Sequence, residues 1–358
     1  MPTLVPSPSV AVVGAGIAGT ACAAALRQAG LRVTLFEKSA VIGGRMATMP
    51  ATWTGDDGAA LGGEFDIGAQ LIGARHARFR ARLALAEAAG VVAAWRPRVH
   101  AAWPATPVRE CWVGVPGMPA LTRHLAQGVP QRLSTTVQRL HRTGDGWQLV
   151  LSGGATSGPY DQVVLALPPA QAAVLLAGHA DAWADELAAV PMQACWALMA
   201  VTDDVDWPWD AVEPDRGPLA WVARNDRKPG RLATPGLAAW VALATPPWSA
   251  AQLEAEPAAV AGALREALTA LLPYSRPGAP ALRWHHAAVH RWRDAVPARG
   301  LAGSGDCRWD AALGLGLCGD IFGGGDVEGA WRSGDELADT LIAGLDARTA
   351  PTETAEMS

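Results

Sequence analysis

Apolar residues near the start of the chain form two short runs on either side of a stretch of small residues. Residues 10–13 are a continuous, mostly β-branched run, which is typical of a fully buried parallel strand. Residues 20–29 have the composition of a small-residue helix that ends at Gly30, and residues 31–36 form a second strand-like run. The pattern predicts a strand–helix–strand unit, from which α/β domains with parallel sheets are built.

Further apolar runs along the chain predict a mixture of strands and helices. Two runs at 137–140 and 147–151 flank a turn rich in Gly and Asp and predict a hairpin. The other expected strands cover residues 161–167, 195–201, 219–223, 238–243 and 312–319, and the expected helices cover residues 253–272 and 327–345.

Three glycines lie between the first strand and the first helix. Gly14, Gly16 and Gly19 form a G-x-G-x-x-G pattern, and Glu37 follows the second strand. In this order the first glycine allows a tight turn, the second lets the backbone approach a pyrophosphate, and the third lets the helix pack closely on the strand. The helix N-terminus attracts phosphates, and the acid accepts hydrogen bonds from a ribose. We predict a dinucleotide site for FAD or NAD rather than NADP, because Glu37 suits an unphosphorylated ribose.

A second glycine pair follows six residues after Glu37. Gly43 and Gly44 precede Arg45 and Met46. The glycines let the chain pass close to a diphosphate, and the arginine brings a permanent positive charge to it. This second clamp favours a permanently held FAD over NAD. The alternative is a glycine loop with a solvent-exposed arginine.

Composition and charge exclude several classes of protein. A length of 358 residues suits two packed domains or one large α/β unit, and a composition that is half hydrophobic and only 18% charged argues against wholesale disorder. A net charge of −5 without any basic run argues against nucleic-acid binding. Five scattered cysteines without a C-x-x-C pair argue against a disulfide framework or a zinc site. The N-terminus lacks a basic secretory region, and the apolar stretch at 10–26 is short for a membrane span and broken by glycines. We therefore expect a soluble, cytoplasmic protein.

With these motifs the chain resembles the FAD-dependent amine-oxidase superfamily and, within it, the renalase family. The residues that carry the resemblance beyond the glycine motifs are 66–70 (DIGAQ, similar to a D-x-G-A-Q segment beside the flavin), 112–118 (similar to an element containing G-M), 160–168, 317–320, 327–330 and 333–334. The resemblance extends from residue 10 to residue 345. It implies an α/β fold: a Rossmann-type doubly wound FAD-binding domain with an inserted substrate domain of mixed β-sheet and helices.

The resemblance also implies which residues contact FAD. These are Gly14, Gly16, Ala18, Gly19, Glu37, Lys38, Gly44, Arg45, Met46, Gln70, Leu71, Val137, Gly319, Asp320, Glu328, Gly329 and Ala330. Leu71 departs from the family, which commonly has an aromatic residue there, and the loop at 52–64 is longer than usual. The helix that begins at residue 327 is expected to direct its positive dipole end toward the flavin. No cysteine lies in an attachment motif, so the flavin is expected to be non-covalent, with Cys318 as the position to check.

The same motifs divide the chain into two domains. The expected FAD-binding domain comprises residues 1–71, 127–169 and 301–348, the expected substrate domain comprises residues 72–126 and 170–300, and residues 349–358 form a tail.

Candidate substrate-site residues are few. Many amine oxidases surround the amine with tyrosines and hold a lysine through water near the flavin, but this chain has only two tyrosines, Tyr160 and Tyr274, and two lysines. Because Lys38 follows the ribose acid, Lys228 is the candidate lysine. The scarcity of tyrosines and lysines favours a dinucleotide, rather than an amine, as hydride donor. The segment around Asn225 and Lys228 resembles the family's polar-basic segment, which would hold a carboxamide or phosphates. The alternative is a solvated hairpin turn.

A run of alternating aromatic residues precedes the C-terminal element. On a strand, the residues that would share one face are Trp284, His286, Ala288, His290 and Trp292. They would line a pocket above the flavin or pack in the core. On a helix, the i, i+4 spacing of the histidines would point to a metal. The composition favours a strand, so we expect no metal site.

The resemblance implies an enzyme, an FAD-dependent oxidoreductase, that needs no obligatory protein base, since hydride transfer to oxidised flavin requires none. The expected activity is that of a renalase-like oxidase. Isomeric dihydro-NAD(P), in the 2- or 6-dihydro forms, is oxidised to NAD(P)+, and molecular oxygen is reduced to hydrogen peroxide. The alternatives are an amine oxidase or desaturase of the same superfamily and a catalytically silent FAD-binding protein.

Overall fold

The computed structural model describes residues 7–55, 57–100, 111–272, 281–301 and 305–349. The chain divides into two compact units, each formed by segments that are distant in the sequence. Unit 1 comprises Met1–Ile42, Leu125–Val190 and Arg299–Ser358, and unit 2 comprises Gly43–His124 and Pro191–Ala298. Relative to the predicted domains, residues 43–71 lie in unit 2 and residues 170–190 lie in unit 1.

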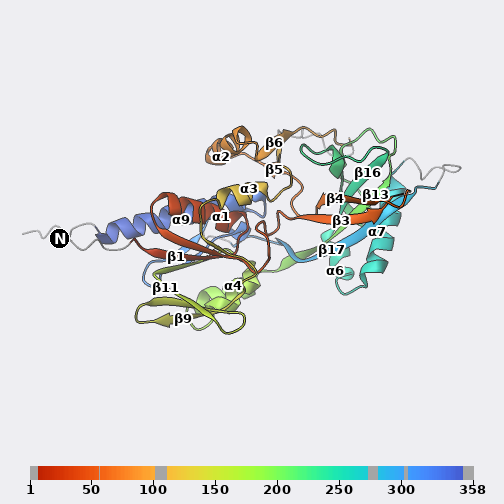
Figure 1. Cartoon of the computed structure of the whole chain (residues 1–358). Coiled ribbons are helices and arrows are strands. Elements are labelled where there is room, and N and C mark those ends of the chain that lie inside the picture. The colour runs from red at the N-terminus through yellow and green to blue at the C-terminus, as the bar shows by residue number, and fades with distance from the viewer. Residues whose placement is uncertain (1–6, 56, 101–110, 273–280, 302–304, 350–358) are drawn as a thin grey trace, which may run out of the picture. The chain divides into compact units, whose positions relative to one another are not determined.

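Unit 1 is built on a six-stranded sheet with the strand order β18-β19-β12-β1-β2-β8; its strand β1 and the helices α1 and α9 are labelled in Figure 1. Its strands are β1 (Ser9–Val13), β2 (Arg32–Phe36), β8 (Gln131–Arg132), β12 (Gln162–Leu165), β18 (Arg308–Asp310) and β19 (Leu315–Leu317). All neighbours pair in parallel except β18 and β19. With β1 at its centre, this is the predicted doubly wound sheet, and the strand–helix–strand prediction is confirmed because α1 (Ile17–Gln28) joins β1 to β2.

A three-stranded antiparallel sheet and four further helices complete unit 1. They are β9 (Val137–Thr143), β10 (Gly146–Leu151), β11 (Thr156–Tyr160), α4 (Pro169–Leu176), α5 (Asp181–Ala188), α8 (Asp320–Gly323) and α9 (Val327–Thr349). The pairing of β9 with β10 confirms the predicted hairpin. Leu176 of α4 and Leu187 of α5 pack in one core with Trp147 and Leu149 of β10. This packing is why the segment 170–190 belongs to unit 1.

The strand predicted at 312–319 is shorter than expected. The Asp310 side chain accepts hydrogen bonds from the N–H groups of Ala312 and Leu313, which folds this stretch into a turn. Strand β19 therefore begins only at Leu315.

Unit 2 contains a five-stranded antiparallel sheet with the order β14-β15-β16-β13-β17. The strands are β13 (Met192–Asp203), β14 (Ala211–Val212), β15 (Leu219–Arg224), β16 (Leu237–Ala244) and β17 (Trp284–Pro297). The smaller elements are the β3 (Thr48–Thr54) and β4 (Ala60–Asp66) hairpin, the sheet of β5 (Ile72–Gly73), β7 (Cys111–Gly114) and β6 (Val92–Trp95), the helices α2 (Ala77–Ala88), α6 (Pro246–Ala251) and α7 (Pro257–Leu271), and the 3-10 turn η1 (Asn225–Arg227). Helix α3 (Ala120–Leu125) belongs to unit 2 except for its last residue, Leu125, with which the second segment of unit 1 begins.

Both faces of this sheet are covered, which explains why the middle of β13 is buried throughout. Leu198 lies in one core with Leu264 of α7, whereas Met199, on the opposite face, lies in a second core with Trp53 and Phe65 of the β3–β4 hairpin. Alternate side chains of a strand point to opposite faces, so one continuous apolar strand serves two cores. The hairpin thus completes the core of unit 2.

The aromatic run predicted to share one face of a strand does form β17, but Trp284 does not lie on that face. A register shift between the Val201–His286 and Thr202–Trp284 pairs inserts one residue. Trp284 consequently packs on the α7 side of the sheet, where the Arg265 guanidinium lies 4.6 Å from its ring centroid. A bulge of this kind cannot be seen in the alternation of the sequence.

Among the helices that the structure describes, none combines the length and the apolar composition needed to cross a bilayer.

Candidate functional site

The glycine loop between β1 and α1 has the geometry that the G-x-G-x-x-G pattern predicts. A Cβ atom on Gly14 would lie 2.3 Å from the carbonyl oxygen of Ala166, and one on Gly19 would lie 1.9 Å from the carbonyl oxygen of Gly14. These two glycines are therefore required by close packing within the protein. Gly16 differs, because a Cβ there would meet no protein atom within 4 Å. The open space beside Gly16 is where a pyrophosphate is expected to approach the backbone.

The N-terminus of α1 adds an electrostatic attraction at the same place. Gly16 is the N-cap residue of this 12-residue helix, no side chain caps the helix, and no acidic residue occupies its first turn. Backbone N–H groups and the positive end of the helix dipole therefore face the loop, and the first turn of the helix supplies no carboxylate of its own to neutralise them. The loop fits the diphosphate of a dinucleotide.

Glu37 is buried at the end of β2 and is already bound to the backbone. Its Oε2 atom accepts a hydrogen bond of 2.9 Å from the N–H of Ala15, and its Oε1 atom accepts one of 2.8 Å from the N–H of Ser39. Glu37 thus ties the glycine loop to the second strand. Its neighbour Lys38 donates to Gln171 at 3.2 Å on the surface. Contact of either residue with a ribose stays a prediction.

The C-terminal motif lies against the start of α1, which the sequence could only imply through resemblance. A Cβ on Gly334 of α9 would lie 2.1 Å from the carbonyl oxygen of Ala18, so the two helices are in direct backbone contact. Asp320 is buried and begins α8 rather than ending a strand. The N–H of Gly319 donates to Ser333 Oγ at 2.9 Å. The structure therefore brings the first and the last predicted FAD-binding motifs together within unit 1.

The N-terminus of α9 is capped by Asp326, which was not among the predicted FAD-binding residues. Asp326 Oδ1 accepts a hydrogen bond of 2.7 Å from the N–H of Gly329. Glu328 and Ala330 are buried beside it, and Val137 is buried at the start of β9. An aspartate one residue before a helix is a standard N-cap, so this signal was present in the sequence.

In unit 2, the Gly44–Arg45 segment lies beside the DIGAQ segment. The N–H of Ala69 donates to the carbonyl oxygen of Arg45 at 2.9 Å, and a Cβ on Gly68 would lie 1.9 Å from that same oxygen. Arg45 Nη1 donates to the carbonyl oxygen of Ala295 at 3.1 Å. Met46 is buried, whereas Leu71 is half-buried. Two motifs predicted to contact the flavin thus form one local structure.

A buried polar cluster lies next to this structure, and we call Asp66, Gln70, Lys228 and Arg231 the Asp66 cluster. Lys228 Nζ lies 3.1 Å from Asp66 Oδ2 and 3.0 Å from Gln70 Oε1. Arg231 Nη2 lies 2.6 Å from the same Asp66 oxygen, and all three charged side chains are at most 2% exposed. Thr48 Oγ1 donates to the other Asp66 oxygen at 2.7 Å. The cluster is therefore a closed network of charge-assisted hydrogen bonds.

Burial and charge act in opposite directions on this cluster. Burial raises the pKa of Asp66, but Lys228 and Arg231 lower it by more, so the net shift is downward. Burial lowers the pKa of Lys228, and the attraction of Asp66 only partly offsets that shift. Lys228 also lies 5.5 Å from the ring centroid of Trp95. The result is an ionised carboxylate beside an ammonium group that gives up its proton more readily than an exposed lysine.

The other predicted pocket residues are held mainly by structural contacts. Asn225 is buried, its Nδ2 donates to the carbonyl oxygen of Glu64 at 2.8 Å, and its Oδ1 accepts from the N–H of Asp66 at 3.3 Å. Trp292 Nε1 donates to the carbonyl oxygen of Ile67 at 2.9 Å. Both side chains fix the backbone that carries Asp66 and Gln70. Their predicted role at the substrate is not tested by these contacts.

Two of the three histidines of β17, His286 and His290, lie on the face of the sheet that the β3–β4 hairpin covers. The His286 ring lies 6.2 Å from the Phe65 ring and 6.0 Å from the Trp53 ring, and its Nε2 has no hydrogen-bond partner. The His290 ring lies 4.6 Å from that of Trp292. Burial lowers the pKa of both histidines. Within the described part of the chain, no three His, Cys, Asp or Glu side chains are grouped so that they could hold a metal ion.

Comparison with protein families gives two matches along the chain. Residues 12–83 match the NAD(P)-binding Rossmann-like domain, and residues 103–342, about two thirds of the chain, match the family described as flavin containing amine oxidoreductase. Among curated proteins the matches are short. The bifunctional tRNA 5-methylaminomethyl-2-thiouridine biosynthesis protein MnmC of Magnetococcus marinus is 56% identical over 46 residues, and the carotenoid phi-ring synthase of Streptomyces griseus is 50% identical over 48 residues. Each match covers 13% of this chain, and they cover 7% and 9% of those proteins.

Solved structures resemble the chain over nearly its whole length. A protein of Exiguobacterium sp. 255-15, provisionally named as a protoporphyrinogen oxidase, superposes with a TM-score of 0.70 at 14% identity and covers 94% of this chain and 99% of its own. Cyclohexylamine oxidase from Brevibacterium oxydans gives 0.69 at 16% identity, with 95% and 100% coverage. Putrescine oxidase bound to putrescine gives 0.64 at 15% identity, with 94% and 99% coverage. At these identities the similarity shows a shared fold.

Proposed function

The chain belongs to the flavin containing amine oxidoreductase family, and from this premise we propose that it is a renalase-like oxidase of the cytoplasm. Its substrates are isomeric dihydronicotinamide dinucleotides, the 2- or 6-dihydro forms of NAD(P). The reaction yields NAD(P)+ and reduces molecular oxygen to hydrogen peroxide.

FAD is the cofactor that the family implies, and residues of unit 1 fit it. The open space at Gly16, beside the uncapped start of α1, suits the diphosphate. Glu37 keeps acceptor capacity for ribose hydroxyls, because each carboxylate oxygen can accept more than one hydrogen bond. Bound FAD would supply the redox chemistry, since it accepts a hydride from the substrate and passes two electrons to oxygen. We propose that it is held without a covalent bond.

The composition of the Asp66 cluster carries the substrate proposal. Among the residues that the structure describes, Asp66 is the one carboxylate paired with Lys228 and Arg231, so the cluster has one excess positive charge, shielded from solvent, when all three groups are ionised. Charges interact more strongly when they are buried. This excess attracts a phosphate-bearing dinucleotide and disfavours a protonated amine. The proposed role of the buried cluster is to favour an anionic substrate through its charge, and not to remove a proton.

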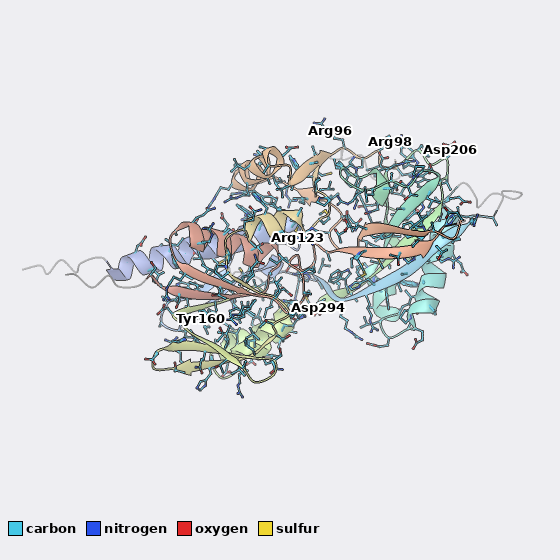
Figure 2. All side chains as sticks on the ribbon, viewed as in Figure 1. Arg96, Arg98, Arg123, Tyr160, Asp206 and Asp294 are labelled. Atoms are coloured by element: carbon cyan, nitrogen blue, oxygen red, sulfur yellow. The ribbon has the colours of Figure 1, made fainter. Side chains whose placement is uncertain are left out.

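An amine oxidase is the second candidate function. The fold shared with cyclohexylamine oxidase and putrescine oxidase favours it, as does the burial of the candidate lysine, Lys228. A tyrosine cage has little support. Tyr160 lies in β11 of unit 1 (Figure 2), where its hydroxyl is 3.0 Å from Ser157 Oγ, and Tyr274 lies outside the described residues.

In the deciding experiment, the FAD-loaded protein is mixed anaerobically with borohydride-reduced NAD. The absorbance of the oxidised flavin is followed at about 450 nm. Rapid bleaching, followed by peroxide on admission of oxygen, supports the dinucleotide oxidase. Bleaching by cyclohexylamine or putrescine instead supports the amine oxidase. A retained flavin that neither class reduces would show a catalytically silent FAD-binding protein.

A further inference from the structure

A polar pocket lies in unit 1 and is lined by residues of β1, β2, β8 and β11. Ser9 and Arg32 line the pocket and begin β1 and β2, whereas Gly14 and Glu37 follow the last residues of those strands. Five residues of strand span about 16 Å. Ser9 and Arg32 therefore lie away from the glycine loop, whereas Arg132 pairs with Phe36 and its carbonyl oxygen accepts a hydrogen bond of 2.9 Å from the N–H of Glu37. The pocket thus extends along β2 toward the place where the ribose is expected. Its volume of about 550 Å³ lies in the range of small-molecule sites.

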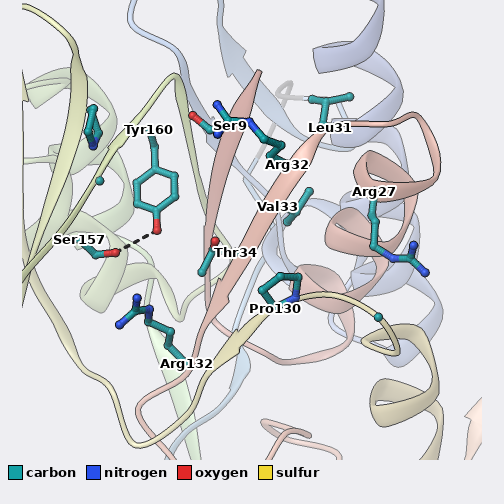
Figure 3. Close-up of a pocket in the computed structure, with 13 residues that line it drawn as sticks. Ser9, Arg27, Leu31, Arg32, Val33, Thr34, Pro130, Arg132, Ser157 and Tyr160 are labelled. Carbon is teal, nitrogen blue, oxygen red and sulfur yellow. Dashed lines mark hydrogen bonds between the residues drawn. The ribbon is translucent and has the colours of Figure 1, made fainter. Parts of the chain in front are cut away.

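Two arginines enter this pocket from the same face of the sheet (Figure 3). The ring of Phe36 meets that of Tyr160 edge-on at 6.0 Å, so this face of β2 is directed toward the β9–β11 sheet. Arg32 is on the same face as Phe36 because both are even-numbered residues of one strand. Arg132 is the pairing partner of Phe36 in β8, and paired residues of neighbouring strands direct their side chains to the same face.

Two hydroxyl groups also line the pocket. Ser157 Oγ and Tyr160 OH are 3.0 Å apart, and either can donate to the other. Thr34 lines the same side of the pocket, as Figure 3 shows. One of the two linked hydroxyls is always left with a donor for a third group. The pocket therefore offers neutral donors as well as positive charge.

The charge in the pocket is not balanced by its own lining. None of the described residues that line it is acidic, and Arg27 adds a third guanidinium on the other side of β2. The nearby carboxylate of Asp161 accepts hydrogen bonds from both the N–H and the hydroxyl of Ser9 at 2.7 Å, and it also attracts Arg32, so it partly offsets the charge of that arginine. Arg32 Nε donates to the carbonyl oxygen of Ser7 at 2.8 Å. Arg132 is exposed. Such a concentration of arginine is notable in a chain whose net charge is −5.

We propose that this pocket binds a phosphate-bearing small molecule, held by the guanidinium groups of Arg32 and Arg132 and by the Ser157–Tyr160 hydroxyl pair. Guanidinium presents parallel N–H donors that match two phosphate oxygens, and arginine stays charged at every physiological pH. The hydroxyls would bond a third oxygen. Binding at this site does not depend on the redox reaction proposed above.

Titration calorimetry with inorganic pyrophosphate tests the proposal, on FAD-saturated protein so that the glycine loop is occupied. Ionic strength is held constant with sodium chloride because screening weakens charge attraction. Saturable binding is expected in the wild-type protein. Arg132→Gln and, separately, Arg32→Gln should each weaken it by at least about tenfold, the loss of one charge-assisted pair. The matched control is Arg139→Gln, which removes an exposed arginine of β9 outside the pocket and should leave affinity within about twofold.

Two results would overturn the proposal. One is the absence of saturable pyrophosphate binding to the wild-type protein. The other is binding that Arg132→Gln and Arg139→Gln weaken equally, since that would reflect the overall charge of the surface rather than this pocket. The flavin spectrum of each variant, recorded before titration, establishes that unit 1 retains its fold.

Discussion

The ammonium nitrogen of Lys228 lies 3.1 Å from Oδ2 of Asp66, although the two residues are 162 positions apart and neither side chain is exposed. The pair joins the end of β4 to the turn after β15. Arg231 shares the same carboxylate oxygen. Within the described part of the chain, Asp66 is the one anion paired with these two buried cations, so its removal should destabilise unit 2.

Asp66→Asn is expected to lower the free energy of unfolding by about 3–5 kcal/mol, because it leaves buried charges without a counter-ion. Lys228→Met should cost less, since Asp66 then keeps Arg231 as its partner. Urea denaturation followed by circular dichroism measures both changes.

The control for this prediction is Arg216→Gln. Arg216 pairs with Asp215 at 3.4 Å, and its side chain is 89% exposed. An exposed pair of this kind contributes at most about 1 kcal/mol. If Asp66→Asn cost no more than the control, the Asp66 cluster would not stabilise the fold.

Acidification should destabilise the protein partly through the histidines of β17. Burial lowers the pKa of His286 and His290 below the ordinary value of 6.5. Below pH 6.5 the unfolded chain takes up protons that the folded protein does not, so stability falls as the pH drops toward the folded pKa values. The melting temperature is therefore expected to be lower at pH 5 than at pH 7.5.

His286→Phe should reduce that dependence on pH. The His286 Nε2 atom has no partner, and the ring stacks near Phe65, so a phenyl ring suits the site and does not titrate. The matched control is His141→Phe at an exposed position of β9, which should leave the pH dependence unchanged. Equal slopes of melting temperature against pH in His286→Phe and wild type would contradict the assignment.

Acid precipitation should release the flavin, because we expect no covalent bond between Cys318 and the flavin. The thiol of Cys318 instead interacts with the thiol of Cys22. A hydrogen bond with Cys318 is the largest cause that raises the pKa of Cys22, followed by burial, and both residues are buried. Flavin is expected in the supernatant for the wild-type protein and for Cys318→Ala alike. Yellow colour that stays with the precipitated wild type and is lost in Cys318→Ala would instead indicate a bond to this sulfur.

The order of motifs along the sequence was sufficient to predict much of unit 1. It was less informative for unit 2. The glycine loop was predictable because Gly14, Gly16 and Gly19 follow a strand directly and act through backbone geometry near their own position. Lys228 was found by elimination, since only one other lysine exists. Arg231 was missed because its partner, Asp66, is 165 positions away and only the tertiary fold brings them together. Trp284 was misplaced because a bulge depends on the pairing of two strands rather than on one.

Alanine at Gly16 and at Gly19 should have opposite consequences, and the contrast tests the predicted diphosphate site. A Cβ on Gly19 would lie 1.9 Å from the carbonyl oxygen of Gly14, so Gly19→Ala must displace the backbone and should lower the melting temperature. A Cβ on Gly16 meets no protein atom within 4 Å, and alanine at an N-cap costs at most about 1 kcal/mol relative to glycine. Gly16→Ala should therefore fold while its FAD content falls several-fold, because the methyl group occupies the space that the diphosphate needs. The ratio of absorbance at 450 and 280 nm, measured after dialysis at about neutral pH, reports FAD content, and melting of the apoprotein reports stability. A Gly16→Ala protein that retains FAD as well as wild type would place the diphosphate elsewhere.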